Sequence, residues 1–169
     1  KIKAILPKDK QVTINLLPNA AFTPNTIYNV DLNEYDRHVT SILNKVQPDV
    51  LSFDNYPLGT STKLTDQSVI YYLKNLLEIN TQCRDAGVEA TSIIQSAQFG
   101  TCRMPSSTEL MFLTNMNLVS GMDGITYFLF YSHDGYTGLV NASWGNNRLF
   151  NVAKNINKGI SKMKGVFKD

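Results

Sequence analysis

The sequence predicts an α/β fold built from four consecutive strand–helix units. Short apolar runs, each bounded by Pro, Gly, Asn or Asp, recur at regular intervals along the 169 residues. Between these runs lie longer segments whose apolar side chains follow helical spacing. Because each expected strand is separated from the next by a helix, the strands are expected to be parallel and joined by helical crossovers.

Each expected strand is apolar on both faces, as is typical of buried parallel sheets. The first run is QVTINLLP, and the second, DVLSFDNY, is enclosed by Pro48 and Pro57, which cannot donate a ladder hydrogen bond. The expected strands cover residues 11–18, 49–56, 88–96 and 124–131.

Four helices are expected to follow the strands. Asp31 and Asp66 are the expected N-caps of the first two helices, and Gly87 is a suitable residue to end the second. The Ser-Ser-Thr-Glu segment at 106–109 has the pattern of a capping box for the third. The expected helices cover residues 32–46, 68–86, 106–120 and 148–164.

Composition and charge argue against several classes of protein. A hydrophobic content of 43% suits a soluble domain over residues 1–169, and a net charge of +2 without a basic stripe does not indicate nucleic-acid binding. No apolar run reaches the roughly 18 residues of a membrane span, so no membrane partner is expected. Cys83 and Cys102 are expected to be free thiols, and no metal or other cofactor is expected. The compartment stays open between cytoplasm and secretion.

Two architectures fit four strand–helix units: a doubly wound open sheet and a segment of a (β/α)8 barrel. No Gly-rich phosphate-binding loop follows any expected strand, which disfavours a nucleotide-binding doubly wound sheet. A complete barrel needs roughly 250 residues, so a chain of 169 residues with four units corresponds to half of one.

In both architectures, functional side chains gather where the strands end. Asp54 and Gln95 each end a buried strand, where a polar side chain is costly unless it is paired, and this favours a functional role. Asn15 could instead hydrogen-bond to backbone groups at a strand end, and Tyr56 could instead pack in the core. Amides, carboxylates and aromatic rings together are the groups that bind sugars. The candidate residues are Asn15, Asp54, Tyr56, Gln95, Arg103, Phe130 and Trp144.

Three segments of the chain resemble glycoside hydrolases of family 42 and their relatives. PDVLSFDNYP, at 48–57, is very similar to the sixth-strand motif of that family. VTINLLPN, at 12–19, resembles the fifth strand, and residues 93–131 resemble the stretch from the seventh strand through the eighth. The resemblance implies strands five to eight of a TIM-type (β/α)8 barrel, which is a half-barrel fragment whose N-terminal half is missing.

The resemblance also implies retaining hydrolysis by two carboxyl groups about 5–5.5 Å apart. In that family the acid/base lies on strand four, upstream of Lys1, and the nucleophile ends strand seven, where this chain has Gln95. An amide cannot form the glycosyl ester. The implied function is therefore a bacterial glycoside hydrolase-like protein that acts on a β-glycoside, with Asp54 as the nearest alternative carboxylate. The alternative is a non-catalytic, carbohydrate-binding pseudo-glycosidase.

Overall fold

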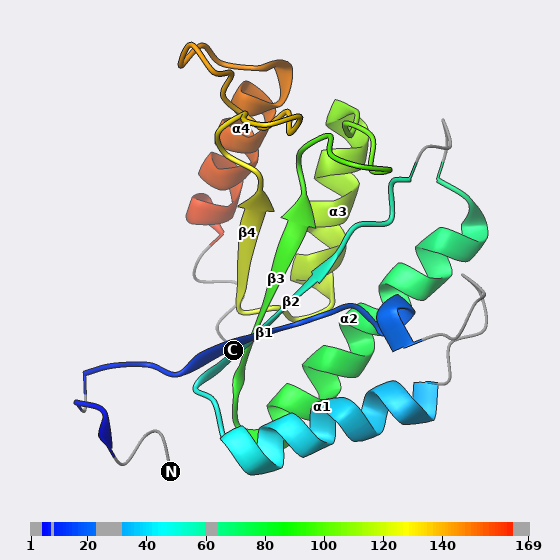
Figure 1. Ribbon diagram of the computed structural model, residues 1–169, viewed down its shortest axis with the longest axis vertical. Helices are drawn as coiled ribbons and strands as arrows, with labels where there is room; N and C mark the ends of the chain where they lie inside the picture. Colours follow the sequence, from blue (N-terminus) through cyan, green and yellow to red (C-terminus); the bar gives the residue numbers. More distant parts are fainter. Residues whose placement is uncertain (1–4, 8, 23–31, 60–63, 164–169) are drawn as a thin grey trace.

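A computed structural model describes residues 5–7, 9–22, 32–59 and 64–163 of the chain. Strands and helices alternate through these residues (Figure 1). The elements are β1 (Thr13–Leu16), the short 3-10 helix η2 (Asn19–Phe22), α1 (Leu32–Val46), β2 (Val50–Asn55), α2 (Asp66–Ala86), β3 (Glu89–Gln95), α3 (Ser107–Val119), β4 (Gly124–Phe128) and α4 (Arg148–Lys162). The α/β class expected from the sequence is thereby confirmed.

The four strands form one parallel sheet in the order β1-β2-β3-β4. Each strand pairs with the strand that follows it in the chain, so β1 and β4 lie at the two edges. Each neighbouring pair is parallel, so the C-terminal ends of the strands share one end of the sheet, while the strand directions fan out from β1 to β4 (Figure 1). This confirms the expected parallel order and brings the strand-end candidates to one side of the molecule.

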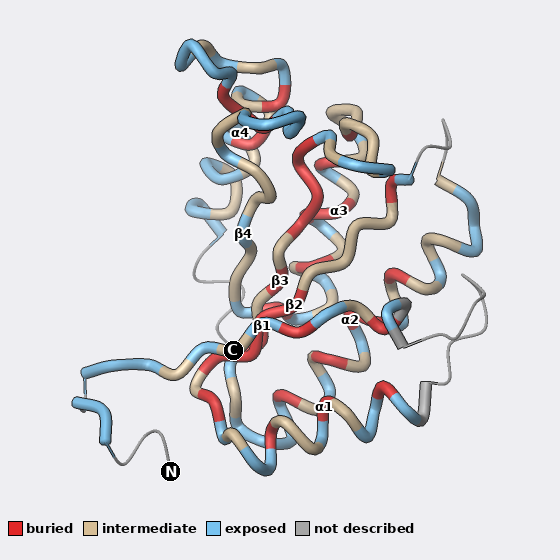
Figure 2. Tube along the Cα trace, in the orientation of Figure 1, coloured by how far each residue is buried: buried red, intermediate tan, exposed pale blue. Residues whose placement is uncertain are grey.

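The helices bury one face of the sheet. Leu51 and Phe53 of β2 belong to the larger core cluster together with residues of α1 and α2, and Ile94 of β3 belongs to a smaller cluster with α3 and α4. In Figure 2, buried segments appear along β2 and β3 and at intervals along the helices. Because side chains alternate along a strand, the residues between these point to the opposite face. Asp54 and Gln95 therefore lie on this opposite face, which none of the described helices covers and which we call the helix-free face.

The helix-free face is rich in small hydroxyl side chains. Thr13, Ser52, Thr91 and Thr126 all have the strand parity of this face, which follows from the packing of their neighbours against the helices. Thr13 and Thr126 are exposed, whereas Ser52 is buried. The sheet thus has one apolar, covered face and one face with hydrogen-bonding groups.

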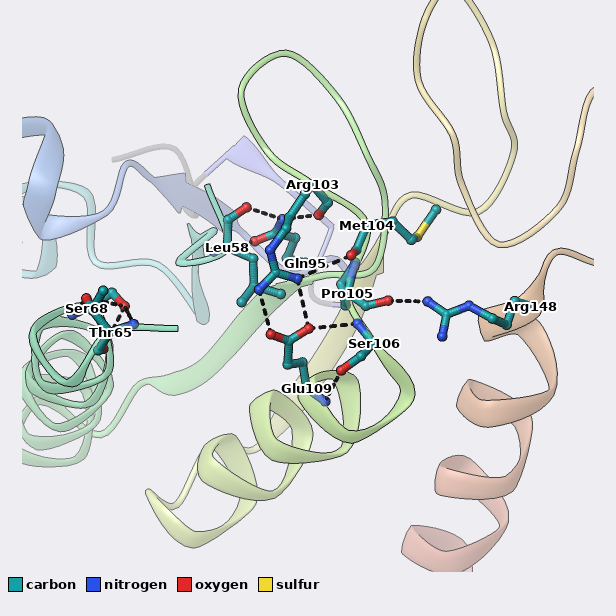
Figure 3. Close-up of polar contacts among 10 residues, drawn as sticks. All are labelled: Leu58, Thr65, Ser68, Gln95, Arg103, Met104, Pro105, Ser106, Glu109 and Arg148. Carbon is teal, nitrogen blue, oxygen red and sulfur yellow. Dashed lines mark hydrogen bonds and ion pairs between the residues drawn. The ribbon is translucent and has the colours of Figure 1, made fainter. Parts of the chain in front are cut away.

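The helix starts agree only in part with the sequence expectations. The capping box of α3 is present, since Ser106 Oγ accepts from the Glu109 amide at 3.1 Å and the Glu109 carboxylate accepts from the Ser106 amide at 2.8 Å. The N-cap of α2 is Thr65 and not Asp66, because the Thr65 hydroxyl accepts from the Ser68 amide at 3.2 Å (Figure 3). Asp31 lies outside the described residues.

The last strand ends three residues earlier than expected. The Phe128 carbonyl accepts from the Ser96 amide at 2.7 Å, which extends the contact between β3 and β4 to this point. The next two carbonyls, of Leu129 and Phe130, accept instead from the amides of Leu139 and Val140 in the following loop. The chain therefore leaves the sheet after Phe128, because its own loop provides the hydrogen-bond partners.

Cys83 is buried and Cys102 is partly buried, and both are free thiols, as expected. None of the helices in the described ranges is long and apolar enough to cross a membrane.

Candidate functional site

Two polar side chains from neighbouring strands meet on the helix-free face. The Asn15 amide of β1 donates to the Asp54 carboxylate of β2 at 2.9 Å. Asn15 is exposed and Asp54 is partly buried, so the carboxylate faces solvent at the strand ends. The structure thus brings together two of the residues that the sequence suggested, and the hydrogen bond fixes the orientation of the carboxylate.

Next to this pair lies a group of rings that we call the aromatic cluster: Tyr56, Phe99, Phe128 and Tyr136. The ring centroid of Phe99 lies 5.2 Å from Tyr56, 4.9 Å from Phe128 and 5.7 Å from Tyr136. Phe99 and Tyr136 are stacked at an interplanar angle of 10°, and the His133 ring also stacks on Tyr136, with centroids 5.3 Å apart. Phe128 also contacts the other rings, with its centroid 5.3 Å from Tyr56 and 6.3 Å from Tyr136, so Phe99 and Phe128 together form the centre of the cluster.

Two loops that are joined by backbone hydrogen bonds hold the aromatic cluster. Gln98, in the loop after β3, and Thr137, in the loop after β4, exchange backbone hydrogen bonds of 3.0 and 2.9 Å. This small antiparallel bridge fixes Phe99 and Tyr136, the immediate chain neighbours of the two bridged residues. The rings consequently have a defined place above the sheet end.

Tyr56 connects the aromatic cluster with the Asn15–Asp54 pair. Burial raises the pKa of the Tyr56 phenol above its ordinary value, and the negative charge of nearby Asp54 raises this pKa further. Tyr56 is therefore a neutral hydroxyl donor at physiological pH. A carboxylate acceptor, an amide donor and a phenol donor lie in this region together with aromatic rings.

Gln95, suggested by the sequence as the residue at the nucleophile position, is fully enclosed. Its side chain is 0% exposed. Its carbonyl oxygen accepts from the Leu58 amide at 3.0 Å, and its amide nitrogen donates to the carbonyls of Leu58 at 3.0 Å and Arg103 at 2.8 Å (Figure 3). These three bonds satisfy the amide in both directions, so Gln95 holds the loops after β2 and β3 together and is not presented to a ligand.

Arg103, suggested as a sugar contact, is engaged in an ion pair. Its guanidinium donates to both oxygens of Glu109 at 2.9 and 2.6 Å (Figure 3). The same carboxylate caps α3 through the Ser106 amide. Hydrogen bonding from Arg103 lowers the pKa of Glu109 to about 2, from an ordinary value of 4.5. Arg103 thus joins the loop after β3 to the start of α3.

The Arg103–Glu109 pair should make stability depend on pH in acid. Glu109→Gln should lower the free energy of unfolding by about 1–2 kcal/mol at pH 7, since a bidentate charged pair and a cap are weakened. The carboxylate stabilises the fold above its unfolded pKa, and this contribution is lost as pH falls from about 4.5 toward 2. The difference in free energy of unfolding between wild type and variant, measured with urea, should therefore become smaller over this pH range. The exposed Glu89→Gln is the control, and a constant difference from pH 7 to pH 2.5 would contradict the assignment.

The two remaining candidates lie away from the Asn15–Asp54 pair. Phe130 lines a cleft between β4 and α4 with Tyr127 and Phe150, so it is not brought together with Asp54 as its expected position at a strand end implied. Trp144 lies in the loop after β4, is 71% exposed, and packs its ring 4.8 Å from that of Tyr131. These positions separate both residues from the aromatic cluster.

Sequence reasoning missed Phe99, Phe128 and Tyr136. Phe128 could have been found from strand alternation, because it shares its parity with Thr126 and not with Tyr127, which packs against α4. Phe99 and Tyr136 lie in loops, and no local pattern indicates that two loops far apart in sequence will pair.

Among the residues that the structure describes, no group of three or more His, Cys, Asp or Glu side chains could hold a metal ion. No protein family, curated protein or solved structure matches the chain. The geometry of the strand ends is therefore what indicates a function for this chain.

Proposed function

We propose that this protein binds carbohydrate, specifically a β-linked glycoside, at the C-terminal end of its sheet. The observation that supports this proposal is the combination of the Asn15–Asp54 pair with the aromatic cluster at one sheet end. A carboxylate and an amide hydrogen-bond sugar hydroxyls in both directions, and an aromatic ring packs against the C–H groups of a pyranose. Tyr56, a member of the aromatic cluster, supplies a neutral hydroxyl near Asp54.

We further propose that the four strand–helix units are half of a (β/α)8 barrel. All-parallel sheets are normally covered on both faces, whereas the helices within the described ranges cover only one. The strands also occur in chain order, as they do in a barrel, with β1 and β4 free to pair with further strands. In such a barrel the helix-free face would line the interior and Asp54 would lie at its mouth.

Hydrolysis of the glycoside is the second candidate function, and Asp54 is the observation that favours it. A retaining mechanism needs an ionised carboxylate as nucleophile and a second carboxyl group about 5–5.5 Å away. In the described ranges, Glu109 is paired with Arg103, and Asp134 lies 3.5 Å from His133 on an exposed turn. A second catalytic carboxyl group would therefore come from elsewhere in the protein.

Calorimetric titration with methyl β-glycosides tests the proposed binding. Asp54→Asn should weaken binding at least tenfold, because a hydrogen bond to a charged group contributes about 1.5–3 kcal/mol. The control is Asp85→Asn, which removes an exposed carboxylate near the opposite end of the sheet and should leave the affinity unchanged.

Aryl β-glycoside hydrolysis by the same proteins distinguishes the two candidate functions. Turnover by the wild type that is lost in Asp54→Asn would support hydrolysis, whereas turnover that survives this substitution would remove Asp54 as nucleophile. The proposed site would be refuted if the wild type bound no saccharide. It would also be refuted if Asp54→Asn and Asp85→Asn lost the same amount of saccharide affinity.

A further inference from the structure

The loop between β4 and α4 is an ordered scaffold. It extends beyond the strand tips, at the same end of the molecule as the loop after β3 (Figure 1). Its backbone is closed by hydrogen bonds from the Ser132 amide to the Val140 carbonyl at 2.8 Å and from the Asn147 amide to the Leu139 carbonyl at 2.8 Å. The Asn147 side chain also donates to the Gly138 carbonyl at 2.7 Å. A side chain presented by this loop is therefore held in a fixed position.

A tight turn within this loop presents Trp144. The Asn141 side-chain oxygen accepts from the amides of Ser143 at 3.0 Å and Gly145 at 2.8 Å, and the Trp144 amide donates to the Asn141 carbonyl at 3.0 Å. A Cβ atom on Gly145 would lie 2.8 Å from the Asn141 side-chain nitrogen, so a larger residue there would displace the side chain that makes these hydrogen bonds. Trp144 itself has a φ of 62°, an unfavourable conformation for a bulky residue that these hydrogen bonds maintain.

The Trp144 ring is supported from one side only. Tyr131 packs against it with a centroid distance of 4.8 Å and an interplanar angle of 35°, and the Tyr131 hydroxyl donates to the Ala142 carbonyl at 3.0 Å. Trp144 nevertheless remains 71% exposed, so it contributes little to the core. The strained backbone and the supporting ring together maintain a large, open aromatic surface, with the exposed amides of Asn141 and Asn146 on the same turn.

We infer that Trp144, supported by Tyr131, is a second sugar-binding subsite, separate from the aromatic cluster and the Asn15–Asp54 pair. Its open face would stack on one pyranose ring, and the neighbouring asparagine amides would hydrogen-bond the hydroxyls of that ring. The inference rests on the proposed function and defines the ligand further: an oligosaccharide long enough to contact both subsites, not a monosaccharide.

Tryptophan fluorescence tests this subsite directly, because Trp144 is the only tryptophan in the sequence. The probes are β-1,4-linked hexasaccharides of glucose, galactose, mannose and xylose, each compared with its methyl β-monosaccharide. At least one hexasaccharide should change the emission of the wild type in a saturable manner. In calorimetry, Trp144→Ala should lower the affinity for that hexasaccharide about tenfold and leave the affinity for the monosaccharide unchanged.

Two further variants distinguish failure of this subsite from failure of the proposed function. Trp144→Phe keeps an aromatic face and should retain most of the hexasaccharide affinity, which separates stacking from loss of the loop structure. Asp54→Asn should lower the affinity for the monosaccharide, whereas a saturating concentration of the hexasaccharide should still change the Trp144 emission of this variant. A wild-type emission that stays constant while the hexasaccharide binds Trp144→Ala with unchanged affinity would overturn the second subsite alone. Lack of binding by every saccharide would overturn both proposals.

Discussion

Gln95→Glu should destabilise the protein by about 3–5 kcal/mol at pH 7, the range typical of an uncompensated buried charge. The Gln95 amide nitrogen donates to two carbonyls, those of Leu58 and Arg103, in a site that is 0% exposed. A carboxylate has no proton to donate, so two buried carbonyls would face a negative charge. We therefore expect the variant to lose its connection between the loops after β2 and β3, and to gain no glycosidase activity.

The pH dependence of this variant has a definite sign. Burial and the facing carbonyls should raise the pKa of the introduced carboxyl group in the folded state. Its protonated form can donate one of the lost hydrogen bonds, so the variant should be closest to wild type below the unfolded pKa of about 4.3 and lose stability as the pH rises above it.

Urea unfolding of wild type and variant at pH 4 and pH 7 measures the difference between their free energies of unfolding. Gln98→Glu, on the exposed side of the same loop, is the matched control and should stay within about 0.5 kcal/mol of wild type. A Gln95→Glu protein as stable as wild type at pH 7 would show that the amide is not needed for the loop connection.

Phe99→Ala should abolish measurable saccharide binding and lower the free energy of unfolding by about 2–3 kcal/mol. The stability loss is smaller than the 3–5 kcal/mol typical of a fully buried Phe, because Phe99 is only partly buried. The binding loss is expected because the Phe99 ring contacts Tyr56, Phe128 and Tyr136, and without it Phe128 is the remaining ring of the cluster that contacts both tyrosines.

Phe150→Ala is the matched control for this substitution. Phe150 is also a partly buried ring, but it belongs to α4 and packs on the smaller core cluster. Thermal melts should show comparable loss of stability for both variants, while calorimetry should show sugar binding by Phe150→Ala alone. Equal binding by the two variants would exclude the aromatic cluster from the site.

Local sequence signals predicted the helices of this fold better than the ends of its strands. The bounds of α1 coincide with those expected, and the capping box of α3 was correctly predicted, because both depend on neighbouring residues. The end of β4 depends on whether the carbonyls of Leu129 and Phe130 find partners in the sheet or in the following loop. The loop amides that bind these carbonyls lie about ten positions further along the chain, so the apolar run itself does not indicate where the strand ends.

The candidate site could be predicted only where the strands alone determine it. The proximity of Asn15 and Asp54 follows from the adjacent parallel strands, and the structure confirms their contact. Gln95 and Arg103 are polar residues at a sheet end, but loop contacts make them structural. A strand-end position therefore indicates where a side chain lies, whereas its partners decide whether it remains free to bind.

The hydroxyl-rich, helix-free face also affects how the protein meets other polypeptide segments. An apolar face would favour any hydrophobic cover, at about 25 cal/mol for each Å² removed from water. Thr13 and Thr126 are exposed and Thr91 is partly exposed, so their hydroxyl groups can hydrogen-bond to water, and a covering segment must replace those bonds. Matching of donors and acceptors, more than apolar area, would thus select what packs on this face, and would discourage indiscriminate self-association through it.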